Sequence, residues 1–250
     1  MQTYKSTTMI EAPEIDPERL PRHVAVIMDG NGRWAKREGV SRAAGHEAGA
    51  KSVRAIVEAC RELQHIEVLT LYAFSTENWR RSALEVNALF RLLSKYVKIE
   101  LESIHKENIR VTVMGRMAGL PKQAVADLEY SMDRTRSNSA MILNVAINYG
   151  GRAEIADAAK RIARDVNDGK LEANDIDEAT FAKYLYVPDI PDPDLLIRTS
   201  GELRLSNFML WQMSYTEIVA LPTLWPDFRK QHLHEAIAEF QARGRRFGGR

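Results

Sequence analysis

This 250-residue chain has one cysteine, Cys60, no apolar run long enough to cross a bilayer, and no excess of either charge. A single cysteine excludes an intramolecular disulfide and metal sites built from several thiolates, and it is typical of a reducing compartment. Because 35 basic residues balance 34 acidic ones, no overall charge attracts nucleic acid. The polar first 20 residues lack the apolar core of a signal peptide. We therefore expect a flexible tail, residues 1–20, before a cytoplasmic domain.

Other absences limit the chemistry. No pair of histidines has the spacing of a zinc site, and no Gly-x-Ser-x-Gly turn marks a serine hydrolase. Cys60 falls on the apolar face of a predicted helix, where a buried, unreactive thiol is expected rather than a nucleophile. The remaining composition, 45% hydrophobic and 28% charged, is that of a globular protein with a sizeable core. We expect a single domain over residues 21–250 and no hydrolysis by a covalent mechanism.

The hydrophobic pattern alternates between strands and helices. Apolar runs that end at turn residues predict strands, and apolar residues spaced three and four apart predict helices. The predicted strands are 23–28, 66–74, 109–114, 141–147, 195–197 and 217–220, and the predicted helices are 45–63, 82–104, 123–136, 154–166 and 230–247. This order predicts an α/β fold in which helices surround a central, mostly parallel sheet.

Polar loops follow several of the predicted strands. The carboxyl ends of parallel strands share one edge of a sheet, and ligands bind at that edge. The first loop, 29–34, combines the Asp29 carboxylate with an amide, a guanidinium and two glycines, so a phosphate could lie against it and Asp29 could hold a divalent metal. Arg42 and His46 are four residues apart and would share a helical face. A tight turn with surface charges is the alternative interpretation.

Two further loops carry polar groups after strands. The segment 75–81 offers hydroxyls, amides, an aromatic ring and two cations, although it also fits a helix N-cap with solvated arginines. The segment 198–208 places arginines and serines around Gly201, a set of donors that suits a diphosphate. Glu217 is a candidate second metal carboxylate, although an isolated glutamate is usually a solvated charge. The residues alone thus indicate substrates that carry diphosphates, together with a metal.

The order and spacing of these motifs resemble the cis-prenyltransferase family. The matching segments are 23–34, Arg42 with Gly45 and His46, 73–79, 148–151, 197–202, 206–208, 224–228 and 245–249. The resemblance covers almost all of the chain beyond the tail. It implies a homodimeric, Mg²⁺-dependent enzyme with an apolar tunnel beneath its active site. The implied reaction condenses isopentenyl diphosphate repeatedly onto an allylic diphosphate such as farnesyl diphosphate, giving a long product, undecaprenyl diphosphate, the lipid carrier precursor for bacterial cell-wall synthesis.

The resemblance also implies a role for each site residue. Asp29 would bind Mg²⁺ and assist loss of the allylic diphosphate, and Glu217 of the partner subunit would complete the metal environment. Asn78, with Ser75 nearby, would position the isopentenyl unit or accept its proton. The implied substrate-binding residues are Gly30, Asn31, Gly32, Arg33, Trp34, Arg42, His46, Ser75, Thr76, Glu77, Trp79, Arg81, Arg198, Arg204, Leu205 and Ser206.

The chain departs from the family pattern at one place. Ser82 stands where many relatives have proline, and Arg80 adds a charge beside Arg81, so the sequence leaves open which arginine faces the substrate. The apolar stripe of the 82–104 helix, with Leu143 and Val145, would wall the tunnel or serve ordinary core packing.

Three alternatives remain: a short-chain cis-prenyl diphosphate synthase, a phosphohydrolase or nucleotide-binding protein, and an accessory subunit without chemistry. The sequence has neither a phosphate loop of another class nor an obvious water-activating base, and the intact Asp29 and Asn78 argue against the accessory subunit. Release of a long lipid would bring the protein to the inner face of the plasma membrane. The basic C-terminal segment is a candidate contact, although it could equally serve the core and the dimer.

Overall fold

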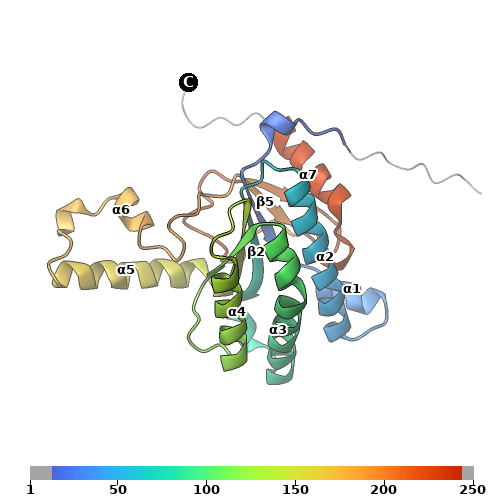
Figure 1. The fold of residues 1–250 in the computed structure, drawn as a ribbon, viewed down its shortest axis with the longest axis horizontal. Helices are drawn as coiled ribbons and strands as arrows, with labels where there is room; N and C mark the ends of the chain where they lie inside the picture. The colour runs from blue at the N-terminus through green and yellow to red at the C-terminus, as the bar shows by residue number, and fades with distance from the viewer. Residues whose placement is uncertain (1–12, 244–250) are drawn as a thin grey trace, which may run out of the picture.

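Six parallel strands form the centre of the fold in a computed structural model that describes residues 13–243 (Figure 1). The strands are β1 (His23–Ile27), β2 (Val68–Ser75), β3 (Ile109–Met114), β4 (Met141–Tyr149), β5 (Leu195–Arg198) and β6 (Glu217–Ala220). Their order across the sheet is β3-β4-β2-β1-β5-β6, and every neighbouring pair is parallel. The predicted parallel sheet is confirmed.

The helices follow the predicted pattern, with shifted ends. They are α1 (Asn31–Arg37), α2 (Arg42–Glu62), α3 (Ala83–Lys106), α4 (Lys122–Thr135), α5 (Gly151–Asn167), α6 (Glu178–Ala182) and α7 (Lys230–Ala242). Short 3₁₀ turns lie at Pro17–Arg19, Thr76–Arg80, Ala173–Asp175 and Trp225–Asp227. Helix α2 begins three residues earlier than predicted because Ser41 caps it, its hydroxyl accepting a hydrogen bond from the Ala44 amide at 3.2 Å. The short α1 and α6 were not predicted.

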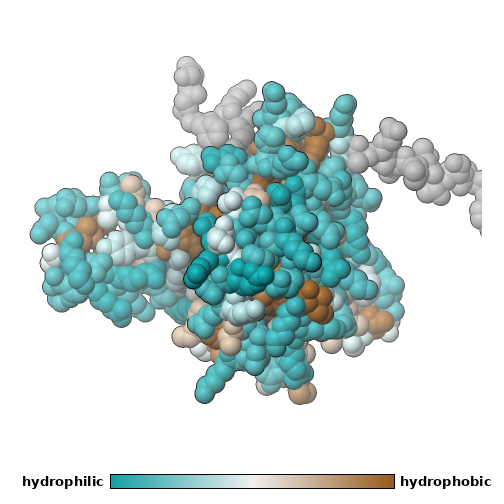
Figure 2. Space-filling model, viewed as in Figure 1, coloured by the Kyte–Doolittle hydropathy of each residue, from teal (hydrophilic) through white to brown (hydrophobic). Residues whose placement is uncertain are grey.

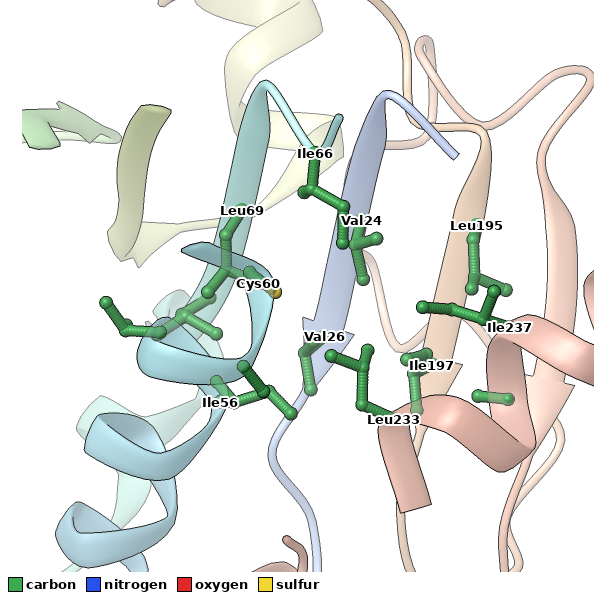
Figure 3. Packing of buried hydrophobic residues seen from close by; sticks show 14 of the residues in the cluster. Val24, Val26, Ile56, Cys60, Ile66, Leu69, Leu195, Ile197, Leu233 and Ile237 are labelled. Carbon is green, nitrogen blue, oxygen red and sulfur yellow. The ribbon is translucent and has the colours of Figure 1, made fainter. Parts of the chain in front are cut away.

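Helices α2 and α7 cover one face of the sheet. Alternate side chains of a strand point to opposite faces, so Val24 and Val26 of β1 both meet this layer. Figure 3 shows them facing Ile56 and Cys60 of α2, with side chains of α7 alongside. Cys60 is fully buried, and burial raises the pKa of its thiol to about 12. The predicted burial of Cys60 is confirmed.

The opposite face of the sheet contains a buried polar chain. His23 Nε2 lies 2.7 Å from Thr70 Oγ1, and its Nδ1 lies 2.6 Å from the Pro191 carbonyl oxygen. Asn144 donates to Thr70 at 3.2 Å and accepts from Thr112 at 3.1 Å. Hydrogen bonds therefore link four neighbouring strands inside the fold, where unpaired polar groups would be costly.

The two ends of the described chain lie close together. The backbone amide of Asp16 donates to the Gln241 side chain of α7 at 2.9 Å, and Gln241 donates back to the Asp16 carbonyl at 2.8 Å. The first twelve residues of the predicted tail and the 245–249 motif lie outside the described residues. Helices α5 and α6 project away from the sheet (Figure 1). No helix within residues 13–243 is both long and apolar enough to cross a bilayer.

Candidate active site

The carboxyl ends of β1, β2, β4 and β5 open onto a cavity of about 810 Å³. Its mouth is polar, and its deeper part is bounded by apolar residues of α2, α3 and β4. The predicted site residues that line it are Asp29, Gly30, Asn31, Gly32, Arg33, Arg42, His46, Ser75, Asn78, Arg81, Arg198 and Ser206. Residues from five distant segments thus converge on one edge of the sheet, and an apolar tunnel lies beneath them.

Asp29 lies between two guanidinium groups at the mouth. Arg198 Nη2 donates to Asp29 Oδ2 at 2.9 Å, and Arg33 Nη2 lies 3.7 Å from Oδ1. Thr199 holds the backbone of this residue, because its hydroxyl accepts from the Asp29 amide at 2.9 Å and donates to the Asp29 carbonyl at 2.6 Å. The carboxylate is therefore oriented and partly exposed to the cavity.

The turn after Asp29 packs closely against its neighbours. Gly30 has φ of 107°, a conformation that strains any residue with a Cβ, and an added Cβ would lie 2.9 Å from Leu224 Cδ2. A Cβ on Gly49 of α2 would lie 2.4 Å from Asn31 Oδ1. That oxygen is buried and accepts no hydrogen bond. Glycine at both positions lets α2 and the turn approach each other at the cavity.

Arg198 is the most enclosed cation of the site, with 3% of its surface exposed. Its Nη1 donates to the Ser206 hydroxyl at 2.6 Å and to the Arg204 carbonyl. Its Nε is buried and has no hydrogen-bond partner. A guanidinium held in this way places a fixed positive charge at the mouth, where it can attract a phosphate.

Asn207 connects three loops around Ser206. Its side chain donates to Glu77 Oε1 at 2.8 Å and accepts from the Arg152 amide at 2.9 Å, and its carbonyl accepts from the Gly151 amide at 2.6 Å. Ser206 and Asn207 have φ of 49° and 63°, a left-handed region that asparagine tolerates better than most residues. The sequence analysis included Asn207 in the 198–208 segment but gave it no role of its own, although an asparagine in a polar loop after a strand is a typical signal of such a turn.

On the opposite wall of the cavity, arginines from two helical segments pair with one carboxylate. Glu85 of α3 lies 3.0 Å from Arg81 and 3.5 Å from Arg42. Burial and then the charge of Arg81 lower the pKa of His46, so its ring is neutral near pH 7. Of the two arginines between which the sequence left the choice open, Arg81 lines the cavity and Arg80 does not. The Glu85 amide donates to the Ser82 hydroxyl at 3.3 Å, a local capping pattern at the start of α3, whereas its carboxylate pairs with the two arginines.

Asn78 faces the cavity from the turn after β2. Its Oδ1 accepts from the Ser75 amide at 3.1 Å, which fixes the amide side chain against its own loop. Neighbouring Trp79 donates to Asn148 Oδ1 at 2.7 Å and stacks on Phe90 at 5.6 Å between ring centroids, so it supports the turn and does not line the cavity.

The other predicted site residues also lie off the cavity lining. They are Trp34, Thr76, Glu77, Arg204, Leu205 and Glu217. Trp34 donates to Asp227 at 2.8 Å. Glu217 lies at the amino end of β6 and pairs with Arg243 at 3.2 Å, whereas Asp29 follows the carboxyl end of β1. Within the chain, the two candidate metal carboxylates therefore lie at opposite ends of the strands.

The donor set at the mouth fits a magnesium ion shared with a diphosphate. Within residues 13–243 no three or more His, Cys, Asp and Glu side chains gather into a metal cluster. Magnesium, however, commonly binds one or two carboxylates together with substrate phosphates. Asp29 supplies such a carboxylate beside the arginines that would hold the phosphates.

The chain has relatives that match almost its whole length. Residues 27–248 match the family model described as putative undecaprenyl diphosphate synthase. The chain is 54% identical to the isoprenyl transferase of Heliobacterium mobile, covering 94% of this chain and 90% of that protein. It is 50% identical to that of Bacillus subtilis, covering 92% and 88%.

Two solved structures share the fold. Lavandulyl diphosphate synthase from Lavandula x intermedia, in complex with dimethylallyl diphosphate, superposes with a TM-score of 0.90 at 37% identity, covering 93% of this chain and all of that one. A probable undecaprenyl diphosphate synthase from Campylobacter jejuni gives 0.76 at 36% identity, covering 92% and 99%. The predicted fold class is confirmed.

Proposed function

Because this chain belongs to the undecaprenyl diphosphate synthase family of prenyltransferases, we propose that it adds isopentenyl diphosphate repeatedly to an allylic diphosphate such as farnesyl diphosphate. The product would be undecaprenyl diphosphate. The observation that carries this proposal is the position of Asp29, held by Arg198 beside Arg33 at the polar mouth of a large apolar cavity.

The turn after Asp29 would hold the allylic diphosphate. When the allylic carbon–oxygen bond breaks, negative charge develops on the departing diphosphate, and fixed cations stabilise it. Arg33 and Arg42 line the cavity at this place, and neutral His46 can hydrogen-bond to a phosphate oxygen. Asp29 would hold Mg²⁺, which when bound neutralises further charge on the diphosphate.

The segment after β5 would hold isopentenyl diphosphate. Arg198 and Ser206 line the mouth, where the guanidinium charge and the serine hydroxyl would contact phosphate oxygens. The new carbon–carbon bond forms as the isopentenyl double bond attacks the allylic carbon, and a proton then leaves the isopentenyl unit. Asn78 would position that unit or accept the proton. The growing hydrocarbon would enter the apolar cavity, which keeps water from the allylic cation.

The position of Glu217 supports a homodimer. In one subunit this carboxylate is at the far edge of the sheet from Asp29, so its role at the metal requires Glu217 of the partner subunit. We place the enzyme in the cytoplasm, with peripheral contact to the inner face of the plasma membrane during product release.

Purified protein should be incubated with radiolabelled isopentenyl diphosphate, farnesyl diphosphate and Mg²⁺, and the products resolved by chain length. We expect products of undecaprenyl length that disappear in Asp29→Ala, because this variant loses the carboxylate at the mouth. Asp133→Ala, which removes an exposed carboxylate on α4, is the matched control and should retain activity. Products only a few units longer than the starter would indicate a short-chain synthase, and no incorporation with any starter would overturn the proposal.

A further inference from the structure

The deep part of the tunnel contains one carboxylate. Tyr96, Glu100 and Ile104 form a row on α3 at intervals of four residues, and all three line the cavity. Ile104 also packs against the main hydrophobic core, which marks the deep end. Glu100 is fifteen residues beyond Glu85 at the mouth, or about 22 Å along the helix. Among the described residues it is the only acidic group of the lining below the mouth.

Arg54 of α2 neutralises this carboxylate across the gap between the two helices. Arg54 Nε lies 2.9 Å and 3.0 Å from the two oxygens of Glu100, and Nη2 lies 2.5 Å from one of them. The Glu100 side chain is 17% exposed, whereas that of Arg54 is 52% exposed. Arg54 thus reaches from solvent to a residue of the tunnel wall. Figure 2 shows that the face of the molecule on which α3 and α4 lie is mainly hydrophilic, with a few hydrophobic residues exposed.

Besides Arg42–Glu85 at the mouth, another ion pair joins the same helices but does not line the tunnel. Lys95 Nζ lies 2.6 Å from Glu47 Oε1, and both side chains are about half exposed. Neither residue lines the cavity. Among the described residues, three ion pairs therefore span the gap between α2 and α3, and only Arg54–Glu100 lies at the deep part of the tunnel.

We propose that the Arg54–Glu100 pair determines product length by allowing the hydrocarbon chain to enter the deepest part of the tunnel. This inference rests on the proposed function. Hydrocarbon beside Glu100 displaces the water that would otherwise hydrate the carboxylate. A charge that loses water without a partner is strongly disfavoured, whereas a paired charge is tolerated. Arg54 provides the pairing without occupying tunnel volume.

The test compares product lengths among three variants. Arg54→Ala leaves an unpaired carboxylate in the wall, so its products should be shorter than those of the wild type, while the first additions proceed at the normal rate. Arg54→Ala combined with Glu100→Leu removes the carboxylate as well and should restore long products. Lys95→Ala breaks the pair outside the tunnel and should leave the product length unchanged.

Binding measurements test the inference without turnover. Alkyl diphosphates of increasing chain length should be titrated into each variant by calorimetry. Arg54→Ala should weaken binding of the longest probes by about tenfold while short probes bind as before, and the double variant should recover the loss. The inference is overturned if Arg54→Ala changes neither product length nor long-probe binding, if Lys95→Ala has the same effect, or if Glu100→Leu does not reverse it. If the proposed function is wrong but this inference holds, the wild type incorporates no isopentenyl diphosphate, yet probe binding still distinguishes the variants.

Discussion

The Arg198 side chain connects three groups of the site. It joins the Asp29 carboxylate, the Ser206 hydroxyl and the Arg204 carbonyl, and it is almost completely buried. Nη1 makes the contacts to Ser206 and Arg204, and Nη2 makes the contact to Asp29. A lysine ammonium is a point charge on a flexible stem and cannot reproduce this arrangement.

We predict that Arg198→Lys lowers kcat/KM by roughly 10- to 100-fold, because hydrogen bonds to charged groups contribute about 1.5–3 kcal/mol each. The loss should fall mainly on KM for isopentenyl diphosphate, measured in steady-state assays that vary each substrate in turn. Arg136→Lys, an exposed arginine paired with Asp133, is the matched control and should behave as the wild type. An unchanged kcat/KM in Arg198→Lys would contradict this role.

At the scale of elements, α2 packs against the first loop of the site at distances that only glycine permits. The Gly49 carbonyl accepts a hydrogen bond from the Trp225 indole at 2.9 Å, and Asn31 Oδ1 fills the space that a Cβ on Gly49 would need. Gly45 lies one turn earlier, with the Asn31 carbonyl oxygen 2.5 Å from its Cβ position. The helix therefore positions the turn as well as covering the sheet.

Gly49→Ala should destabilise the protein by about 1–3 kcal/mol, because the added methyl group overpacks a filled space. The favourable effect of alanine on helix propensity is smaller, about 1 kcal/mol. Urea denaturation monitored by circular dichroism measures the change in the free energy of unfolding. Lys51→Ala, an exposed position on the same helix, is the control and should stay within about 0.5 kcal/mol of the wild type. A Gly49→Ala variant as stable as the wild type would contradict the close packing of α2 against the turn at Asn31.

At the scale of the whole molecule, His23 links protonation to folding. Burial lowers its pKa to about 4, whereas an unfolded histidine titrates near 6.5. Above pH 6.5 the ring is neutral in both states, so it contributes no pH dependence. As the pH falls from 6.5 towards 4, the unfolded state binds a proton that the folded state does not, and stability is lost.

We therefore predict that the free energy of unfolding falls by up to about 3 kcal/mol between pH 6.5 and pH 4 through this residue. His46, whose pKa is also lowered, acts in the same direction. His23→Gln should be less stable than the wild type at pH 7 but lose less stability on acidification. Urea denaturation across this pH range gives both quantities, with exposed His65→Gln as the control. Equal acid sensitivity of the wild type and His23→Gln would contradict the prediction.

Much of the fold could be predicted because its signals are local. The strands β3 and β6 have the predicted bounds, since short apolar runs end at turn residues on both sides. The parallel order follows from alternating strands and helices, and it brings Asp29, Ser75 and Arg198 to one edge of the sheet. The family resemblance added the residue roles.

The tertiary structure alone decided how side chains of distant segments pair. Glu85 belongs to a local capping pattern, yet its carboxylate lies between Arg42 and Arg81 because α2 and α3 meet across the cavity. Trp34 is the last residue of the first predicted loop, yet its indole donates to Asp227. Periodicity in the sequence determines which face of a helix or strand is buried, whereas the partner of a polar side chain depends on the packing of elements far apart in the chain.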